Sequence, residues 1–471
     1  MKNLISYRGA GALLTLLLMV TGCSLPSTDL AKPDASVPSN YRYAPTKNGK
    51  RAAVSDKWWR SFGDSGLNSL MTQVRTGNRD LRGGMKRIEQ ARALVDSTRS
   101  GRIPRVSSSP TASRDKTSGE VVRGSSVGSQ EGYISNNYTL PVSVDWELDL
   151  FGRIRRGEDA AKADAQAAEE DYLALRLSLE TQTAAAYFSL RALDSEIGIV
   201  REGVKSRKSS LKLANDRKDL GVVSELDVAQ AQALLATSEA DLAALLRQRA
   251  AQVSAIAVLV GKPASSFSLA PRGLTGRPPS VPAGIPSELA RARPDIRRAE
   301  RRLAAENARV GVAVASFYPS ISLSGRMGLQ ASDISDLFTK GAQFWGIGPS
   351  VYLPIFRGGQ GRADLRRSKA RYEEVLESYQ QTVLESLAEV ETALSAAKHY
   401  RSQVSAQNRV VTASAQARDI AKAQYEGGTV SYLSVLDAER TSLNGEREQA
   451  RLKGAEFVNT VQLIRSLGGR W

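Results

Sequence analysis

Residues that could carry out catalysis are scarce in this chain of 471 residues, which has one cysteine, Cys23, and one histidine, His399. A metal site normally takes several His, Cys or carboxylate ligands, and a nucleophile needs a base beside it. The glycine-rich segment 357–361 is not followed by the Gly-Lys-Ser/Thr of a phosphate loop, so we interpret it as a strand-to-helix turn. The sequence therefore predicts no enzyme, no cofactor and no metal site.

The position of Cys23 indicates a different chemistry. A positively charged start precedes an apolar run, 10–20, which is too short to cross a bilayer as a helix. Small residues follow, as in a secretory signal, and Val20-Thr21-Gly22-Cys23 resembles the lipobox of bacterial lipoproteins. We expect residues 1–22 to be removed and Cys23 to carry lipid; an ordinary signal peptide with a chance cysteine is the alternative. Ser24, in place of Asp, resembles an outer-membrane sorting signal.

The net charge of +16 does not by itself indicate nucleic-acid binding. Basic residues are interleaved with acidic ones in stretches such as 297–302, which is typical of a solvated helix face, and an export signal argues against nucleic acid. No second long apolar run follows the signal. A membrane crossing is therefore expected to use a β-barrel.

The chain contains an internal duplication. Segment 221–228 matches 428–435, and segment 80–104 matches 295–319 in a second register, both without gaps. We predict two copies of one domain, each with the order helix, strand, strand, long helix, turn, helix. The expected boundaries are a signal peptide at 1–22, an N-terminal lipidated extension at 23–66, a first repeat at 67–262, a linker at 263–286 and a second repeat at 287–471.

Alternating apolar and polar residues predict the strands. In 138–150 the even-numbered positions are apolar and most odd-numbered ones are polar, and 320–330 and 345–355 follow the same period of two. The remaining strand, roughly 103–116, is polar and is placed mainly by the repeat. Strands of this length with one apolar face fit the wall of an outer-membrane barrel, and a soluble sandwich with one wet face is the alternative.

Very long helices are predicted beside these strands. Between Gly361 and Gly427 there is no glycine or proline, and apolar residues step by four and three as in a coiled coil. At about 1.5 Å per residue such a helix approaches 100 Å. A similar helix of the first copy starts near Glu158. The opening helix of each copy is expected at about 67–100 and 287–316.

Each long helix is expected to end in a hairpin tip. Gly221 and Gly428 can take the left-handed conformation that ends a helix. Ser224 and Ser431 can cap the returning helices, and Ser224-Glu225-Leu226-Asp227 has the form of a capping box.

Several motifs together resemble the TolC superfamily, specifically the NodT-type outer-membrane efflux lipoproteins of resistance-nodulation-division pumps. The motifs are Trp58-Trp59 with Phe62, Asp64 and Leu67, Asn78-Arg79-Asp80-Leu81 with Gln90-Ala91-Arg92, Arg293-Pro294-Asp295-Ile296-Arg297-Arg298-Ala299-Glu300, Ala315-Ser316-Phe317-Tyr318-Pro319, and Gly428-Thr429-Val430-Ser431-Tyr432-Leu433. The resemblance covers nearly the whole mature chain.

The resemblance implies a mixed α and β fold. Three copies would share a membrane β-barrel, with four strands per protomer and twelve in the trimer, continuous with a long periplasmic α-helical barrel. It also implies a passive duct that exports drugs or other small toxic molecules, lipid-anchored in the outer membrane and extending into the periplasm. The implied partners are a periplasmic membrane-fusion adaptor and an inner-membrane transporter.

The strand count supports three copies independently. Four strands cannot close a barrel, and eight would be filled by their own side chains. Twelve strands are the smallest multiple that leaves a conduit.

The resemblance further implies a gate at the periplasmic end, where related ducts constrict with rings of acidic side chains. Asp437 matches the family's Asp after Gly428, while Ser434 stands where some relatives have a second Asp. Asp227 matches an Asp that helps to latch neighbouring helices, although the latching Arg position is Val430 here. The alternative is that Asp437 and Asp227 are ordinary surface or cap residues of first helical turns.

Two other classes of protein compete with the duct. A periplasmic adaptor would lack lipid-facing strands, and an envelope hydrolase would need a convergent polar site that the sequence does not show. Within the duct interpretation, the exit duct of a type I protein secretion system is the alternative to drug efflux.

Overall fold

The computed structural model describes residues 37–44, 56–118, 132–282, 284, 286–288 and 292–469. They fall into two compact units. The first, here called the sheet unit, consists of residues 88–168 and 299–379. The second, called the helical unit, consists of residues 34–87, 169–298 and 380–471. Each unit contains segments of both predicted copies, so the units cut across the duplication instead of following it.

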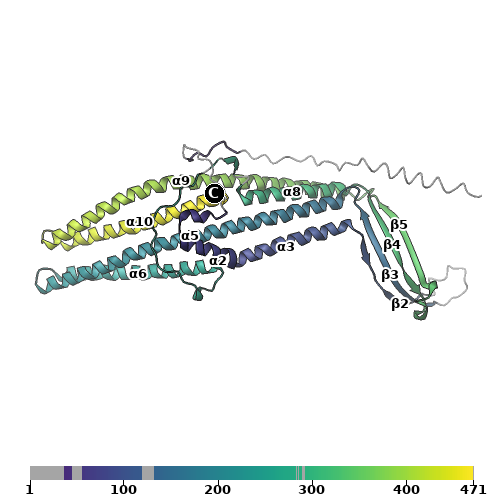
Figure 1. Ribbon diagram of the computed structural model, residues 1–471, viewed down its shortest axis with the longest axis horizontal. Helices are drawn as coiled ribbons and strands as arrows, with labels where there is room; N and C mark the ends of the chain where they lie inside the picture. The colour runs from purple at the N-terminus through teal and green to yellow at the C-terminus, as the bar shows by residue number, and fades with distance from the viewer. Residues whose placement is uncertain are drawn as a thin grey trace, which may run out of the picture. The chain divides into compact units, whose positions relative to one another are not determined.

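The sheet unit contains one antiparallel sheet (Figure 1). Its strands are β1 (Arg105–Ser107), β2 (Thr111–Lys116), β3 (Ile134–Leu148), β4 (Ser320–Ala331) and β5 (Gln343–Tyr352). Both β1 and β2 pair with β3, and the register continues unshifted from Ser107 opposite Ser143 to Thr111 opposite Thr139. They form one strand that is interrupted near Pro110, because proline cannot donate to the ladder. The four predicted strands are therefore present, with the first one broken once.

The pairing brings the apolar positions of all strands onto one side. Val144 lies opposite Val106 and also opposite Gly325, which in turn lies opposite Ile347. Directly opposed residues of an antiparallel pair point to the same side. This apolar face consists of Val106, Leu140, Val142, Val144, Trp146, Leu148, Ile321, Leu323, Met327, Leu329, Trp345, Ile347 and Val351. The predicted alternation is confirmed, and much of the face is exposed, with Trp345 at 77%.

The other side of the sheet is polar. This polar face consists of Arg105, Ser107, Ser143, Asp145, Glu147, Ser322, Ser324, Arg326 and Ser350. The sheet unit also contains most of α3 (Arg79–Arg99) and α8 (Pro294–Ala315), with short 3-10 turns at Ser100–Arg102, Ile334–Asp336 and Lys340–Ala342.

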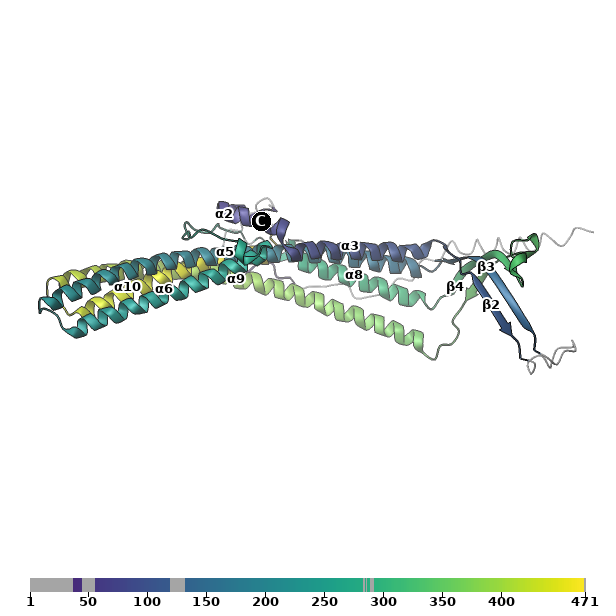
Figure 2. The same ribbon diagram turned by 90° about the horizontal axis from the view of Figure 1, so that it is seen from below.

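Four long helices form two hairpins, α5 (Arg153–Asp219) with α6 (Glu225–Val260) and α9 (Gln360–Glu426) with α10 (Tyr432–Ser466). Helices α5 and α9 each contain 67 residues. They also begin and end at positions that correspond in the register of 221–228 with 428–435, which confirms the duplication. In the helical unit the two hairpins lie side by side (Figures 1 and 2).

The predicted seam of α9 is confirmed. The side chains of Tyr372, Leu376, Val383, Val390 and Leu394 are buried, and those of Tyr379 and Leu387 are half-buried. Tyr372 and Leu376 pack with Leu303 and Val310 of α8 in the sheet unit.

The opening helix of each copy differs from the expectation. In place of one helix over 67–100, the chain forms α2 (Ser65–Gly77) and then α3, with an extended Asn78 between them. The Asn78 Oδ1 accepts a hydrogen bond from the Leu81 NH (3.1 Å), so Asn78 caps the second helix. In the second copy the expected start at about 287 is occupied by a short 3-10 turn (Pro286–Glu288). Helix α8 begins later, at Pro294, because proline suits a first helical position.

An aromatic core holds the 3-10 helix Trp58–Phe62 against the long helices of the helical unit. Phe62 and Phe457 each lie 4.8 Å from Phe188, measured between ring centroids. The segment after Val260, with a short 3-10 turn at Ala264–Ser266, is fastened to α5. Arg191 of α5 donates to the Ala270 carbonyl (2.8 Å).

No second long apolar run was expected after the signal. Helix α6 differs from this expectation, because by length and composition it is apolar enough to cross a membrane. An alanine-rich sequence with few charges gives it this composition. In the structure α6 packs along α5, where Leu245 joins Ile197, Val200 and Val204 in one apolar cluster.

Candidate functional site

The α5–α6 turn forms the first hairpin tip. Gly221 has a left-handed φ of 72°, and the Val222 NH donates to the Arg217 carbonyl (2.9 Å), which satisfies one of the last carbonyls of α5. Ser224 then caps α6. The Asp227 NH donates to the Ser224 Oγ (3.3 Å) and the Ser224 NH donates to the Asp227 Oδ2 (3.0 Å), which is the capping box expected from the sequence.

The α9–α10 turn repeats only the first half of this geometry. Gly428 has a φ of 74°, and the Thr429 NH donates to the Gln424 carbonyl (2.9 Å). Ser431 occupies the N-cap position of α10, but its side chain makes no capping hydrogen bond. The expectation for this hydroxyl is therefore wrong. Ser434 stands where the first tip has Asp227, so no carboxylate is available to complete a capping box.

The three gate candidates lie at these tips. Asp227 is half-buried, and its carboxylate takes part in the capping box. Ser434 and Asp437 are exposed on α10, and the Asp437 Oδ1 accepts a hydrogen bond from the Arg440 guanidinium (2.7 Å). Both side chains of that pair are about two-thirds exposed (67% and 66%), so the ion pair contributes little to stability. A gate role for these residues stays a prediction.

Arg217 connects the two hairpins, a role that sequence reasoning missed. From the last turn of α5 its guanidinium donates to the carbonyls of Tyr425 and Glu426, both at 3.1 Å. It also lies 4.7 Å from the centroid of the Tyr425 ring. These carbonyls end α9, where the helix dipole favours a positive charge. Arg217 thus supplies a cation at the tips, where Val430 cannot.

An apolar cluster drawn from all four long helices adjoins this contact. It consists of Ala214, Ala231, Tyr425, Tyr432 and Val435. Burial, with a smaller contribution from Glu439, raises the pKa of the Tyr432 hydroxyl to about 12. Burial also raises the pKa of the Glu439 carboxyl, although Arg207 opposes it. The tips are therefore held by apolar packing as well as by the Arg217 hydrogen bonds.

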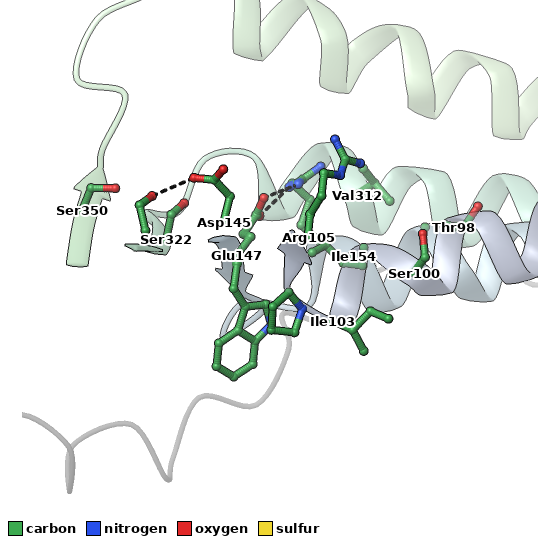
Figure 3. Close-up of a pocket in the computed structure, with 16 residues that line it drawn as sticks. Thr98, Ser100, Ile103, Arg105, Asp145, Glu147, Ile154, Val312, Ser322 and Ser350 are labelled. Atoms are coloured by element: carbon green, nitrogen blue, oxygen red, sulfur yellow. Dashed lines mark hydrogen bonds and ion pairs between the residues drawn. The ribbon is translucent and has the colours of Figure 1, made fainter. Parts of the chain in front are cut away.

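A pocket lies at one end of the polar face, near the start of α5 (Figure 3). The guanidinium of Arg153 donates to both carboxylate oxygens of Glu147 (3.1 and 2.7 Å). The Ser324 hydroxyl donates to the Asp145 Oδ1 (3.0 Å). These pairs satisfy each other, and none of the described residues that line the pocket is a histidine or a cysteine. The arrangement suits a wetted surface of mixed charge.

The Arg293 motif, the most specific one in the resemblance, serves to anchor a helix end. The Arg293 guanidinium donates to both Asp295 oxygens (3.0 and 2.6 Å), to Glu389 (2.7 Å) and to the Ser466 carbonyl (2.8 Å). Burial lowers the pKa of Arg293, but the hydrogen bonds to Asp295 and Glu389 outweigh it and raise that pKa above its ordinary value. Arg293 therefore fastens the end of α10 to the start of α8.

The predicted lipid-attachment residue, Cys23, lies outside the residues that the structure describes. Of the other predicted residues, Gly221, Ser224 and Asp227 lie together at one tip, and Gly428, Ser431, Ser434 and Asp437 lie along the other. Arg217 could have been suspected only from its place in the last helical turn.

Comparisons with known proteins agree with this architecture. The family model described as outer membrane efflux protein matches residues 70–262 and 285–469. Outer membrane protein OprJ of Pseudomonas aeruginosa is 32% identical, over 98% of this chain and 96% of its own length. Cation efflux system protein CusC of Escherichia coli is 30% identical, over 96% of this chain and 97% of its own length.

Solved structures give the same result. The outer-membrane channel OprN matches with a TM-score of 0.87 at 35% identity, over 95% of this chain and 99% of that one. The Campylobacter jejuni CmeC outer membrane channel matches with a TM-score of 0.86 at 27% identity, over 95% of each chain. The chain belongs to the outer membrane efflux protein family.

Proposed function

We propose that three copies of this chain form the outer-membrane channel of a tripartite efflux pump. The observation that carries this proposal is the sheet, which has one continuous apolar face and two edges, β1/β2 and β5, without a partner strand among the described residues. An open edge is a site for pairing with another chain. Three sheets joined edge to edge would give twelve strands with apolar residues towards lipid and the polar face towards a water-filled conduit.

The long helices would continue this conduit into the periplasm as a helical barrel. At about 1.5 Å per residue, the 67 residues of α5 and of α9 correspond to about 100 Å. The hairpin tips would meet a periplasmic adaptor and, through it, an inner-membrane transporter. The duct itself would be passive and carry out no catalysis, so the transporter would select the cargo. Cys23 would add a lipid anchor in the outer membrane.

The cargo proposed is drugs or other small toxic molecules. Relatives at 30% identity carry names for antibiotic, toluene and cation efflux, so proteins equally similar to this chain are named for different cargo. The alternative remains the exit duct of a type I protein secretion system.

The proposal can be tested in a bacterium that lacks its own efflux channels. The chain would be expressed with the adaptor and transporter that co-purify with it, and susceptibility to antibiotics and toluene would be measured. We expect restored resistance together with a trimer whose gel migration changes on heating. A folded trimer that restores no resistance but releases a protein cargo would favour the secretion duct. A chain that shows no heat-modifiable form would contradict the barrel itself.

A further inference from the structure

The apolar face of the sheet ends in two cations. Arg114 lies opposite Asn136, and Lys116 lies opposite Ile134. Ile134 and Asn136 precede Tyr138 on the same side of β3, since alternate residues of a strand share a side. Arg114 and Lys116 therefore belong to the side that carries the apolar face, beyond Tyr138, which lies on that side next to Leu140.

At the end of β2 the basic and the acidic side chains lie on opposite sides of the sheet. Asp115, between the two cations, points to the opposite side of the sheet, where it accepts a hydrogen bond from the Ser113 hydroxyl (2.8 Å). Arg114 and Lys116 are exposed. In the part of the chain that the structure describes, neither cation takes part in an ion pair. The two charged side chains that β2 places on the side of the apolar face are thus both cations.

The length of the apolar face predicts where these cations lie in a membrane. From Leu148 to Tyr138 a strand covers about 33 Å at ~3.3 Å per residue. With a tilt of about 40°, that length spans roughly 25 Å of bilayer, which is the height of the apolar band in outer-membrane barrels. Arg114 and Lys116 would then lie about 5 and 10 Å beyond the band, within the polar headgroup layer.

We propose that Arg114 and Lys116 bind the phosphate groups of anionic lipid headgroups in the leaflet at this end of the barrel. The inference rests on the proposed function, because it requires the apolar face to meet lipid. A guanidinium can bind a phosphate through two parallel hydrogen bonds, and the lysine ammonium adds a point charge. A lipid is favoured over a soluble anion because the two cations directly continue the surface that its acyl chains would cover.

The test uses the purified full-length trimer in neutral detergent, titrated with bis-phosphorylated lipid A or with phosphatidylcholine. Bound lipid is counted by native mass spectrometry. We expect the double variant Arg114→Gln/Lys116→Gln to bind lipid A roughly 30-fold more weakly, because each basic side chain near an anionic surface contributes a factor of about five. Phosphatidylcholine, which has no net charge, should bind equally to both proteins.

A matched control removes two cations from the polar face. Arg105→Gln/Arg326→Gln changes the net charge by the same amount and should leave lipid A binding unchanged. The proposal is overturned if this control weakens lipid A binding as much as the test variant does, or if the test variant binds lipid A like the wild type. It is also overturned if inorganic phosphate, added at the same total charge as the lipid A, displaces the bound lipid. If the double variant does not assemble, Lys116→Gln alone should weaken binding about five-fold. A wild-type chain without a heat-modifiable trimer would instead overturn the proposed function.

Discussion

At the scale of single residues, Arg217 makes a contact that neither hairpin could make alone. Its two hydrogen bonds reach carbonyls 208 and 209 positions away, and these are the last acceptors of α9. Helix-end carbonyls without such a donor must find water instead. The side chain therefore couples the end of one long helix to the end of the other.

We expect Arg217→Gln to loosen the second tip, because a neutral amide cannot span both carbonyls or stack as a cation on Tyr425. Hydrogen bonds from a charged donor contribute about 1.5–3 kcal/mol, and partial exposure reduces this to about 1 kcal/mol. Amide exchange in 425–432 should accelerate about five-fold. Lys218→Gln is the matched control, since Lys218 pairs with Glu225 inside its own hairpin (3.1 Å). Equal acceleration in both variants would contradict the bridging role.

Asp437 gives a second test at this scale. Three Asp437 carboxylates around one axis would repel each other and attract cations. We expect Asp437→Ala to raise leak conductance or to weaken cation selectivity in planar-bilayer recordings, without loss of trimer. Asp419→Ala is the control, because Asp419 is also an exposed aspartate paired with an arginine, Arg418. Unchanged conductance and selectivity in Asp437→Ala would show that Asp437 does not line the constriction.

Which residues of the tips were predictable depends on how far each contact reaches along the chain. The capping box of Ser224 and Asp227 is local, so the sequence predicted it. The Arg217 contact depends on how two hairpins pack, and no local pattern encodes that. Ser431 misled because its position in the repeat is equivalent to Ser224, but the partner three residues on is Ser434.

At the scale of elements, the periodicity of apolar residues and the positions of glycine and proline predicted most of the secondary structure. The alternation in 138–150 gave the correct faces of β3, and the absence of glycine and proline gave the length of α9. Two interruptions were missed. Asn78 divides the opening helix, and the first strand is broken near Pro110. Both are local stop signals, because asparagine is a preferred N-cap and proline cannot donate to the ladder.

The assigned faces of β3 can be tested with two neighbouring substitutions. Val144 is on the apolar face opposite Gly325, and Ser143 is on the polar face opposite Arg326. We expect Val144→Arg to reduce the amount of folded trimer strongly, since an arginine facing lipid near the midplane costs roughly 2–4 kcal/mol. Ser143→Arg should reduce it much less, because that side would face water. Equal loss of heat-modifiable trimer from both would refute the face assignment.

At the scale of the whole molecule, the duplication and the strand count led to a trimer before any contact was known. The structure adds that the compact units do not coincide with the copies, because α5 and α9 contribute residues to both units. Pairing within each unit joins the two copies, as β3 with β4 does. One copy alone would therefore lack half of its sheet, so we expect the duplicated chain to fold as one entity.

The lipid anchor proposed at Cys23 gives the last prediction. One or two acyl chains add about 0.8 kcal/mol of membrane binding per buried methylene, whereas a closed barrel supplies a complete apolar belt of its own. We therefore expect Cys23→Ala to lose all incorporation of radiolabelled fatty acid and still to form the heat-modifiable trimer. Ser24→Ala, which leaves the cysteine in place, should keep the label. Label persisting in Cys23→Ala would contradict lipid attachment at this residue, and loss of the trimer together with the label would mean that the anchor is needed for assembly.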